Sequence, residues 1–260
     1  MRTLLDAIPE IAIVLLFAAA VGATLAILPL VARYALGIVI SKETAEGMQK
    51  GQAAVTGLAA LVAAFSLVQA QVNLTNVQKQ VGTEASQMSQ LDRLLVRYGD
   101  PGVGQIRQTL KAYAGSVVRE EWPELARGHE SPITNDLFGS LSRSILAINP
   151  GQGRQALVYA DILKMTDELA ESRSARVQAA RTRLPTIFWE VILLLLFLVA
   201  AFALLGEARR GSAVALAGQG FGLALLIGLA FVVQFPFNGQ TRVSPSPIGH
   251  ALAAMQARVE

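Results

Sequence analysis

Four long runs of apolar residues dominate the chain, and each is long enough to cross a membrane as a helix. A helix rises about 1.5 Å per residue, so about 20 apolar residues span a hydrocarbon core of about 30 Å. The runs are Ile11–Ala32, Ala53–Val72, Ile187–Gly206 and Ala213–Phe235. Within them, Glu190 is the single charged residue. We therefore predict four transmembrane helices.

The first run has an alternative interpretation as a cleaved signal peptide. Ala18–Ala20 supplies small residues of the kind that signal peptidases recognise. Asp6 and Glu10, however, are untypical of a basic leader, and the apolar run continues well past the alanines. We interpret the run as a retained membrane helix.

The polar part of the chain lies between the second and third runs. The segment Asn73–Arg183 contains 14 of the 22 basic and 12 of the 19 acidic residues. Its apolar residues keep helical spacing directly after the second run, at Val77, Val81, Met88, Leu91 and Leu95. One helix is therefore predicted from Ala53 to about Arg97, and further helices over 103–127, 135–147 and 154–183.

These patterns predict an all-α, polytopic membrane protein with its four transmembrane helices arranged in two hairpins. The first hairpin occupies 1–72 and the second 184–235, where only Glu207–Ser212 separates the two runs. Between the hairpins, 73–183 forms a helical extramembrane domain that continues the second and third membrane helices. The tail, 236–260, is expected to contain a short amphipathic helix.

Composition narrows the possible functions. The chain is 53% hydrophobic and 16% charged, whereas soluble domains contain about 25% charged residues. The near balance of charge and the 6% aromatic content give no basic, aromatic surface for nucleic acid. The sequence contains no cysteine and no catalytic motif, and its two histidines have no partner at ligand spacing. We expect neither an enzyme, nor a cofactor, nor a metal site.

Uncharged polar residues along the second membrane helix are the main candidates for function. Ser66, Gln69 and Asn73 recur at intervals that place them near one another on a helix. Polar groups in hydrocarbon need partners or water, so this stripe either lines a pore or bridges packed helices. The pore interpretation takes these residues with Thr56, and adds Leu61 and Phe65 as apolar constrictions.

Two charged residues near the membrane also permit two interpretations. Arg242, after the fourth run, either belongs to an ordered tail or attracts anions at a pore mouth. Glu190 lies about one turn inside the third run, next to Trp189. We favour an interfacial glutamate paired with a nearby arginine over an ion-pathway group.

Three strings resemble the bestrophin-like domain family of bacterial and plant membrane proteins. The first is the amphipathic segment in which the second membrane helix leaves the membrane, with Phe65, Gln69, Val81, Glu84, Leu91 and Arg93. The second is Leu110–Ala114 followed by Val117–Pro123. The third is Pro236–Gly239 followed by Arg242–Pro245. The resemblance covers nearly the whole chain. Because the family is named for its likeness to bestrophins, which are oligomeric anion channels, it implies a homo-oligomeric ion channel, weakly favoured for anions, in a bacterial inner membrane.

Two functional classes therefore remain open. In one, copies of the chain surround a pore lined by the second membrane helix, with lipid and inorganic ions as partners. In the other, the chain is a membrane-anchored scaffold or signal transducer without conduction. The side of the membrane on which 73–183 lies stays open too, because different counts of basic residues give opposite orientations.

Overall fold

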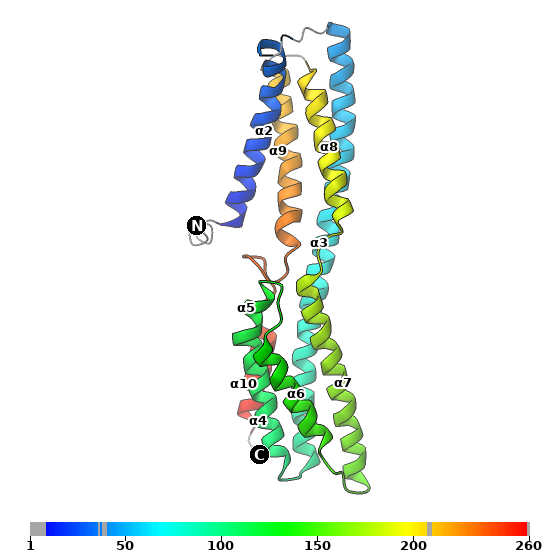
Figure 1. The fold of residues 1–260 in the computed structure, drawn as a ribbon, viewed down its shortest axis with the longest axis vertical. Coiled ribbons are helices and arrows are strands. Elements are labelled where there is room, and N and C mark those ends of the chain that lie inside the picture. Colours follow the sequence, from blue (N-terminus) through cyan, green and yellow to red (C-terminus); the bar gives the residue numbers. More distant parts are fainter. Residues whose placement is uncertain (1–8, 36, 38–40, 207–209, 259–260) are drawn as a thin grey trace. The chain divides into compact units, whose positions relative to one another are not determined.

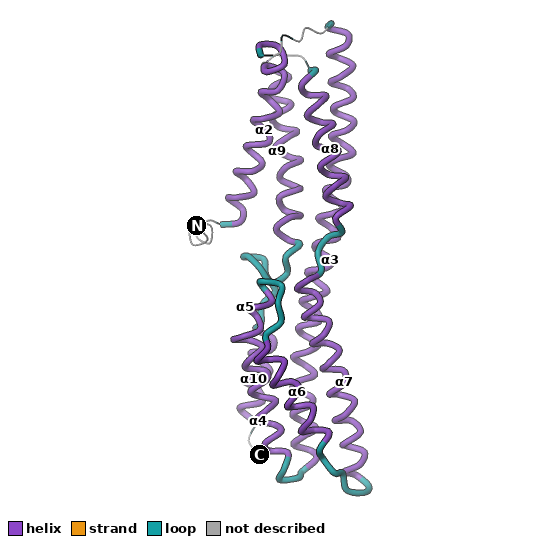
Figure 2. The backbone as a smooth tube through the Cα atoms, in the orientation of Figure 1, coloured by secondary structure: helices purple, strands orange, loops and turns teal. Residues whose placement is uncertain are grey.

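The computed structural model describes residues 9–35, 37, 41–206 and 210–258, and the described residues form helices joined by loops (Figure 2). In chain order the elements are α2 (Glu10–Tyr34), α3 (Lys42–Tyr98), α4 (Val103–Ser116), the π-helix η1 (Val117–Glu121), α5 (Trp122–Leu125), α6 (Pro132–Leu146), α7 (Arg154–Arg181), α8 (Thr186–Leu204), α9 (Arg210–Val233) and α10 (Ser246–Ala257). The all-α prediction is confirmed. Residues 207–209 of the expected short turn lie outside the described part.

The contacts divide the chain into two units (Figure 1). Unit 1 consists of Met1–Asn73, Arg183–Gln234 and Gly239–Thr241, and unit 2 consists of Leu74–Thr182, Phe235–Asn238 and Arg242–Glu260. Helix α3 contributes its first part to unit 1 and its second part to unit 2. In the described part of the chain, four helical stretches are long and apolar enough to cross a membrane, as predicted. They are α2, α3, α9 and the stretch Arg154–Leu204, which ends with the apolar helix α8.

Unit 1 is held together by close packing of small residues between its helices. Helix α2 packs along α9 and also contacts α8 (Figure 1). A Cβ atom added to Gly220 would lie 2.7 Å from Leu25 Cδ1 and 3.1 Å from Gly22 Cα, so α9 needs glycine there to approach α2. On α3, Ala59 and Ala63 are buried against Ile192 of α8 and two apolar residues of α9. Without a hydrophobic driving force in lipid, such small-residue contacts stabilise helix pairs by close van der Waals packing.

Unit 2 is a helical bundle with a local irregularity at its centre. Helix α4 contacts α6 and α10, and α7 packs along the second part of α3 (Figure 1). The helix predicted over 103–127 is interrupted by the π-helix η1 and then by Pro123, which stands at the start of α5. Helix α6 starts three residues earlier than predicted, where the Ser131 hydroxyl accepts a hydrogen bond from the Thr134 amide.

Candidate functional site

The predicted pore residues occupy different environments on α3. Leu61, Phe65 and Gln69 are exposed, Asn73 is half-buried, and Ser66 is fully buried with its hydroxyl donating to the Val62 carbonyl at 2.9 Å. Thr56 is half-buried, and its hydroxyl donates to the Gln52 carbonyl at 2.8 Å. That these residues line a pore stays a prediction.

A narrow stripe of large apolar side chains is exposed along the membrane part of α3. The side chains alternate at intervals of three and four residues, which keeps them on one face of the helix. They are Leu58, Leu61, Phe65, Val68 and Val72, with exposed fractions of 56, 54, 62, 58 and 47%. The opposite face carries the buried alanines that pack on α8 and α9. One face of α3 is therefore left without a partner among the described residues.

A polar contact between membrane helices lies on α3 at the level of Thr56. Gln52 is 2% exposed, and its Nε2 donates to Gln219 Oε1 of α9 at 2.7 Å and to Thr56 Oγ1 at 3.2 Å. Interhelical hydrogen bonds of this kind satisfy polar groups that lipid cannot. Sequence reasoning did not identify this pair, because Gln52 and Gln219 are 167 residues apart.

Arg242, the predicted pore-mouth residue, is exposed in unit 2. It precedes a segment that packs against Trp122. The next residue, Val243, is buried, and its carbonyl accepts a hydrogen bond from Trp122 Nε1 at 3.1 Å. The Trp122 ring packs edge-on against Phe237 with centroids 5.3 Å apart. Two of the strings that carried the family resemblance thus pack against each other, while a role of Arg242 toward ions stays a prediction.

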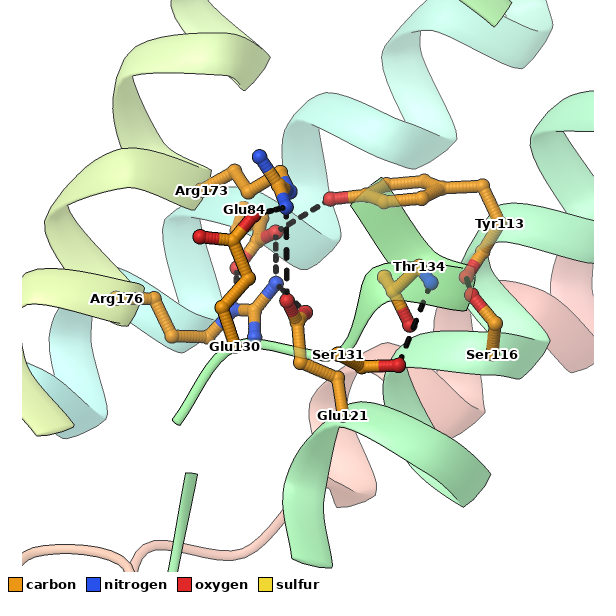
Figure 3. A network of polar contacts seen from close by, with 9 residues as sticks. All are labelled: Glu84, Tyr113, Ser116, Glu121, Glu130, Ser131, Thr134, Arg173 and Arg176. Atoms are coloured by element: carbon orange, nitrogen blue, oxygen red, sulfur yellow. Dashed lines mark hydrogen bonds and ion pairs between the residues drawn. The ribbon is translucent and has the colours of Figure 1, made fainter. Parts of the chain in front are cut away.

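A buried ionic cluster joins several helices of unit 2 (Figure 3). Arg176 of α7 donates through Nε to Glu84 Oε2 at 2.6 Å and through Nη2 to Glu84 Oε1 at 3.1 Å. The Tyr113 hydroxyl of α4 donates to the same Glu84 Oε1 at 3.1 Å. Glu84, Tyr113 and Arg176 all have side chains without measurable exposure. Three helices are therefore joined by one carboxylate.

The π-helix adds a second carboxylate to this cluster. Glu121 ends η1, and its Oε2 lies 2.7 Å from Arg176 Nη2, while its Oε1 lies 3.7 Å from Arg173 Nη2. The first contact is a close ion pair, and no described residue donates a hydrogen bond of standard geometry to either Glu121 oxygen. Arg173 Nη2 also reaches Glu130 Oε1 at 2.8 Å. π-Helical turns often occur at functional sites, and this one brings Glu121 to the two arginines.

Burial and the neighbouring charges shift the pKa values of three residues in this cluster. Burial is the main cause for Glu121 and Tyr113. It raises the pKa of Glu121, although the positive charges of Arg176 and Arg173 lower it in part. It also raises the pKa of Tyr113 well above its usual value, with Glu84 adding to the rise. Burial alone lowers the pKa of Arg176, but Glu84 and Glu121 raise it above the ordinary value, so Arg176 stays charged.

A second buried carboxylate on α3 is also neutralised from within unit 2. Asp92 has no exposed side-chain surface and accepts a hydrogen bond from Arg107 Nε of α4 at 2.8 Å. Its other oxygen pairs with Arg258, which follows α10. In unit 2, both acidic residues of α3, Glu84 and Asp92, are thus buried and paired. The exposed charges of this part of α3 are all basic: Lys79, Arg93 and Arg97.

Sequence analysis did not identify these ionic residues as a site, although a signal for one of them was present. Val81 and Met88 belong to the buried apolar stripe of α3, and Glu84 lies between them at the same three- and four-residue intervals. A charged residue at such a core position indicates a buried partner. The identity of that partner was hidden, because Arg176 lies 92 residues away.

A family model described as the bestrophin-like domain matches residues 14–248. The chain belongs to the bestrophin-like family. The chain is thus a multi-pass protein of that family, with four helices that contact the lipid bilayer. No curated protein sequence matches it.

Solved structures share the fold of this bestrophin-like chain. A crystal structure of a bacterial bestrophin homologue variant from Klebsiella pneumoniae is 17% identical, with a TM-score of 0.66, covering 96% of this chain and 100% of the other. A crystal structure of a membrane protein variant is 16% identical, with a TM-score of 0.67, covering 94% and 99% of the two chains. At these identities the similarity establishes the fold.

Proposed function

We propose that this bestrophin-like protein is a homo-oligomeric ion channel of the cell inner membrane, with α3 lining the pore. One chain supplies four membrane helices, too few to enclose an aqueous path, so several copies surround the axis. The family membership supports a channel rather than an enzyme.

The observation that carries the proposal is the apolar stripe on α3. Because its opposite face is buried by α8 and α9, α3 can present the stripe to an axis while its neighbours face lipid. Large apolar side chains such as Phe65 form constrictions that gate by dewetting, and Gln69 supplies a polar contact for a partly dehydrated ion. Leu61, Phe65 and Gln69 are the exposed members of the predicted pore lining.

The charges of α3 in unit 2 support a preference for anions. Lys79, Arg93 and Arg97 are exposed, whereas Glu84 and Asp92 are buried and paired. A surface lined by one sign of charge raises the local concentration of the opposite ion. Acidic residues of α7 line the same grooves, Glu171 with Lys79 and Glu168 with Arg93, so this part of α3 attracts anions where α3, rather than α7, faces the axis.

A scaffold or signal transducer is the second candidate, favoured by the continuity of α3. The same helix packs in the membrane unit through Ala63 and is held in unit 2 through Glu84. A rigid helix shared by two units can transmit displacement without conducting ions.

Recordings from purified protein in planar bilayers separate the two candidates. We expect Phe65→Ala to raise unit conductance by widening a constriction. Phe197→Ala on α8 is the matched control, because Phe197 is exposed to 69% and Phe65 to 62%, yet the proposal places Phe197 in lipid. Silence over a range of ions and voltages, with intact oligomers, would favour the scaffold.

Ion preference is tested by reversal potentials in a chloride gradient. Lys79→Gln with Arg93→Gln is expected to lower the chloride-to-sodium permeability ratio, since it removes two exposed positive charges from α3. Arg143→Gln with Arg154→Gln, which removes two exposed arginines from α6 and α7, is the control for an equal loss of charge. An equal effect of the control would contradict the role of α3 in ion preference.

A further inference from the structure

A groove of about 580 Å³ lies in unit 2 along the C-terminal end of α7. Residues between Arg173 and Thr182 form one wall, and Glu130, from the loop between α5 and α6, forms part of the other. The volume is within the range of roughly 300–1,000 Å³ that small-molecule sites occupy. No residue of α3 lines the groove, so it is separate from the proposed pore helix.

The charged groups in this groove are two guanidinium groups and one carboxylate. Arg173 lies at its buried side and Arg181 is exposed, while Glu130 is the acidic residue of the lining. Ser174 and Gln178 add neutral groups that can donate hydrogen bonds, whereas the Thr182 hydroxyl donates to the Gln178 carbonyl at 3.0 Å. Without the Glu130 side chain, the lining is positively charged and rich in donors.

Arg173 is held in a fixed position by contacts on two sides. Its side chain is 10% exposed, its guanidinium carbon lies 5.4 Å from the centroid of the Phe138 ring, and Nη2 contacts Glu130 and Glu121. Its Nε is buried and donates to no described residue. A planar guanidinium fixed in this way suits carboxylate and phosphate oxygens, which it can bind through two parallel hydrogen bonds.

Glu130 is bound to Arg173 in the way an external carboxylate would be. Its Oε1 accepts from Arg173 Nη2 at 2.8 Å, and its side chain is 33% exposed. It lies on a short loop shortly after Gly128, whose φ of 79° is favoured by glycine. Because Glu130 is half-buried and reaches Arg173 through one oxygen, a ligand oxygen can replace it on Nη2 while Arg173 keeps its contact with Glu121.

We propose that this groove binds a small oxyanion, carboxylate or phosphate, between Arg173 and Arg181. Glu130 occupies the same position when the oxyanion is absent and competes with it. The oxyanion is either a free solute or the headgroup of a lipid, since both present the same oxygens. The site is independent of conduction.

Calorimetric titration of inorganic phosphate into the full-length protein in detergent tests the site. Glu130→Gln removes the competing charge and is expected to tighten phosphate binding about fivefold. Glu124→Gln is the matched control, because Glu124 is 34% exposed and paired with Arg127 at 2.6 Å, but lies outside the groove. Arg181→Gln is expected to weaken binding by a similar factor. Absence of phosphate binding to a folded Glu130→Gln variant, or an equal gain in Glu124→Gln, would overturn the proposal.

Hydrogen exchange of the wild-type protein gives a second measurement that needs no substitution. Phosphate is expected to accelerate exchange in residues 127–131, as Glu130 is released, and to slow it in 173–182. Unchanged exchange in both segments at millimolar phosphate would also overturn the proposal. Dihexanoyl phosphatidic acid distinguishes the sources: binding tighter than that of phosphate assigns the site to a lipid headgroup, and equal binding assigns it to a free oxyanion.

Discussion

Removal of the Arg176 side chain should destabilise unit 2 strongly. In Arg176→Met, Glu84 loses both of its hydrogen bonds from the guanidinium, at 2.6 and 3.1 Å, and Glu121 loses the nearer of its two ion partners, at 2.7 Å. Both carboxylates have fully buried side chains. Breaking a buried pair leaves an uncompensated charge and costs about 3–5 kcal/mol.

A double-mutant cycle isolates the pair itself. Glu84→Leu combined with Arg176→Met replaces both charges by apolar groups, so the double variant should recover part of the stability that each single variant loses. We expect a coupling energy of about 2–3 kcal/mol, the upper part of the range for residues in contact. The assay is denaturant unfolding in detergent, followed by two probes whose transitions must coincide.

The control cycle uses an exposed pair on the same helix. Lys164 Nζ lies 3.9 Å from Glu168 Oε1, and the two side chains are 77 and 40% exposed. The cycle of Lys164→Met and Glu168→Leu should give a coupling energy of about 0.3–0.5 kcal/mol. If the Glu84 and Arg176 cycle gives no more than this, the cluster does not hold the bundle together and our reasoning is wrong.

Three further predictions concern other parts of the molecule. Because burial raises the pKa of Glu121, its ionised form is disfavoured in the folded protein, so the unfolding free energy should fall as pH rises from about 4.5 through the folded pKa. The Glu121→Gln variant should lack that fall in unfolding free energy. Equal pH profiles of the wild-type protein and the variant would refute the prediction. Gly220→Ala places a Cβ 2.7 Å from Leu25 Cδ1 and should lower the free energy of unfolding, followed by thermal unfolding, by about 1–3 kcal/mol. Gly222→Ala is the control and should leave the free energy of unfolding unchanged, because a Cβ added there has no atom within 4 Å. Gln69→Leu should lower unit conductance and leave assembly intact, and a destabilised oligomer with normal conductance would instead identify Gln69 as a packing residue.

The membrane helices were predictable because the signal for them is local. An apolar run of about 20 residues has few alternatives in lipid, where backbone groups must bond within the segment. The predicted run Ile11–Ala32 corresponds to α2 at Glu10–Tyr34, and the helix predicted to continue from Ala53 to about Arg97 is α3. The start of α3 at Lys42 was missed, because Lys42–Gln52 is polar and has no apolar periodicity.

The details of packing on α3 were not predictable in the same way. Ser66 and Gln69 are close on a helical projection, yet Ser66 is buried and Gln69 is exposed. Three residues turn a helix by about 300°, so a packing boundary can pass between two such positions. Which side of that boundary each residue occupies depends on where α8 and α9 pack.

By itself, therefore, the sequence determined the fold class, the four membrane helices, the continuity of α3 and the family, since each depends on periodicity or on short strings. Tertiary structure alone decided the ionic cluster of Glu84, Glu121 and Arg176, the exposed stripe of α3, and the groove at Arg173. These features join residues far apart in the chain, and their existence depends on the rotation and register with which helices pack. Burial also left the exposed charge of α3 in unit 2 wholly basic: its two acidic residues are buried against arginines, and its basic residues face outward.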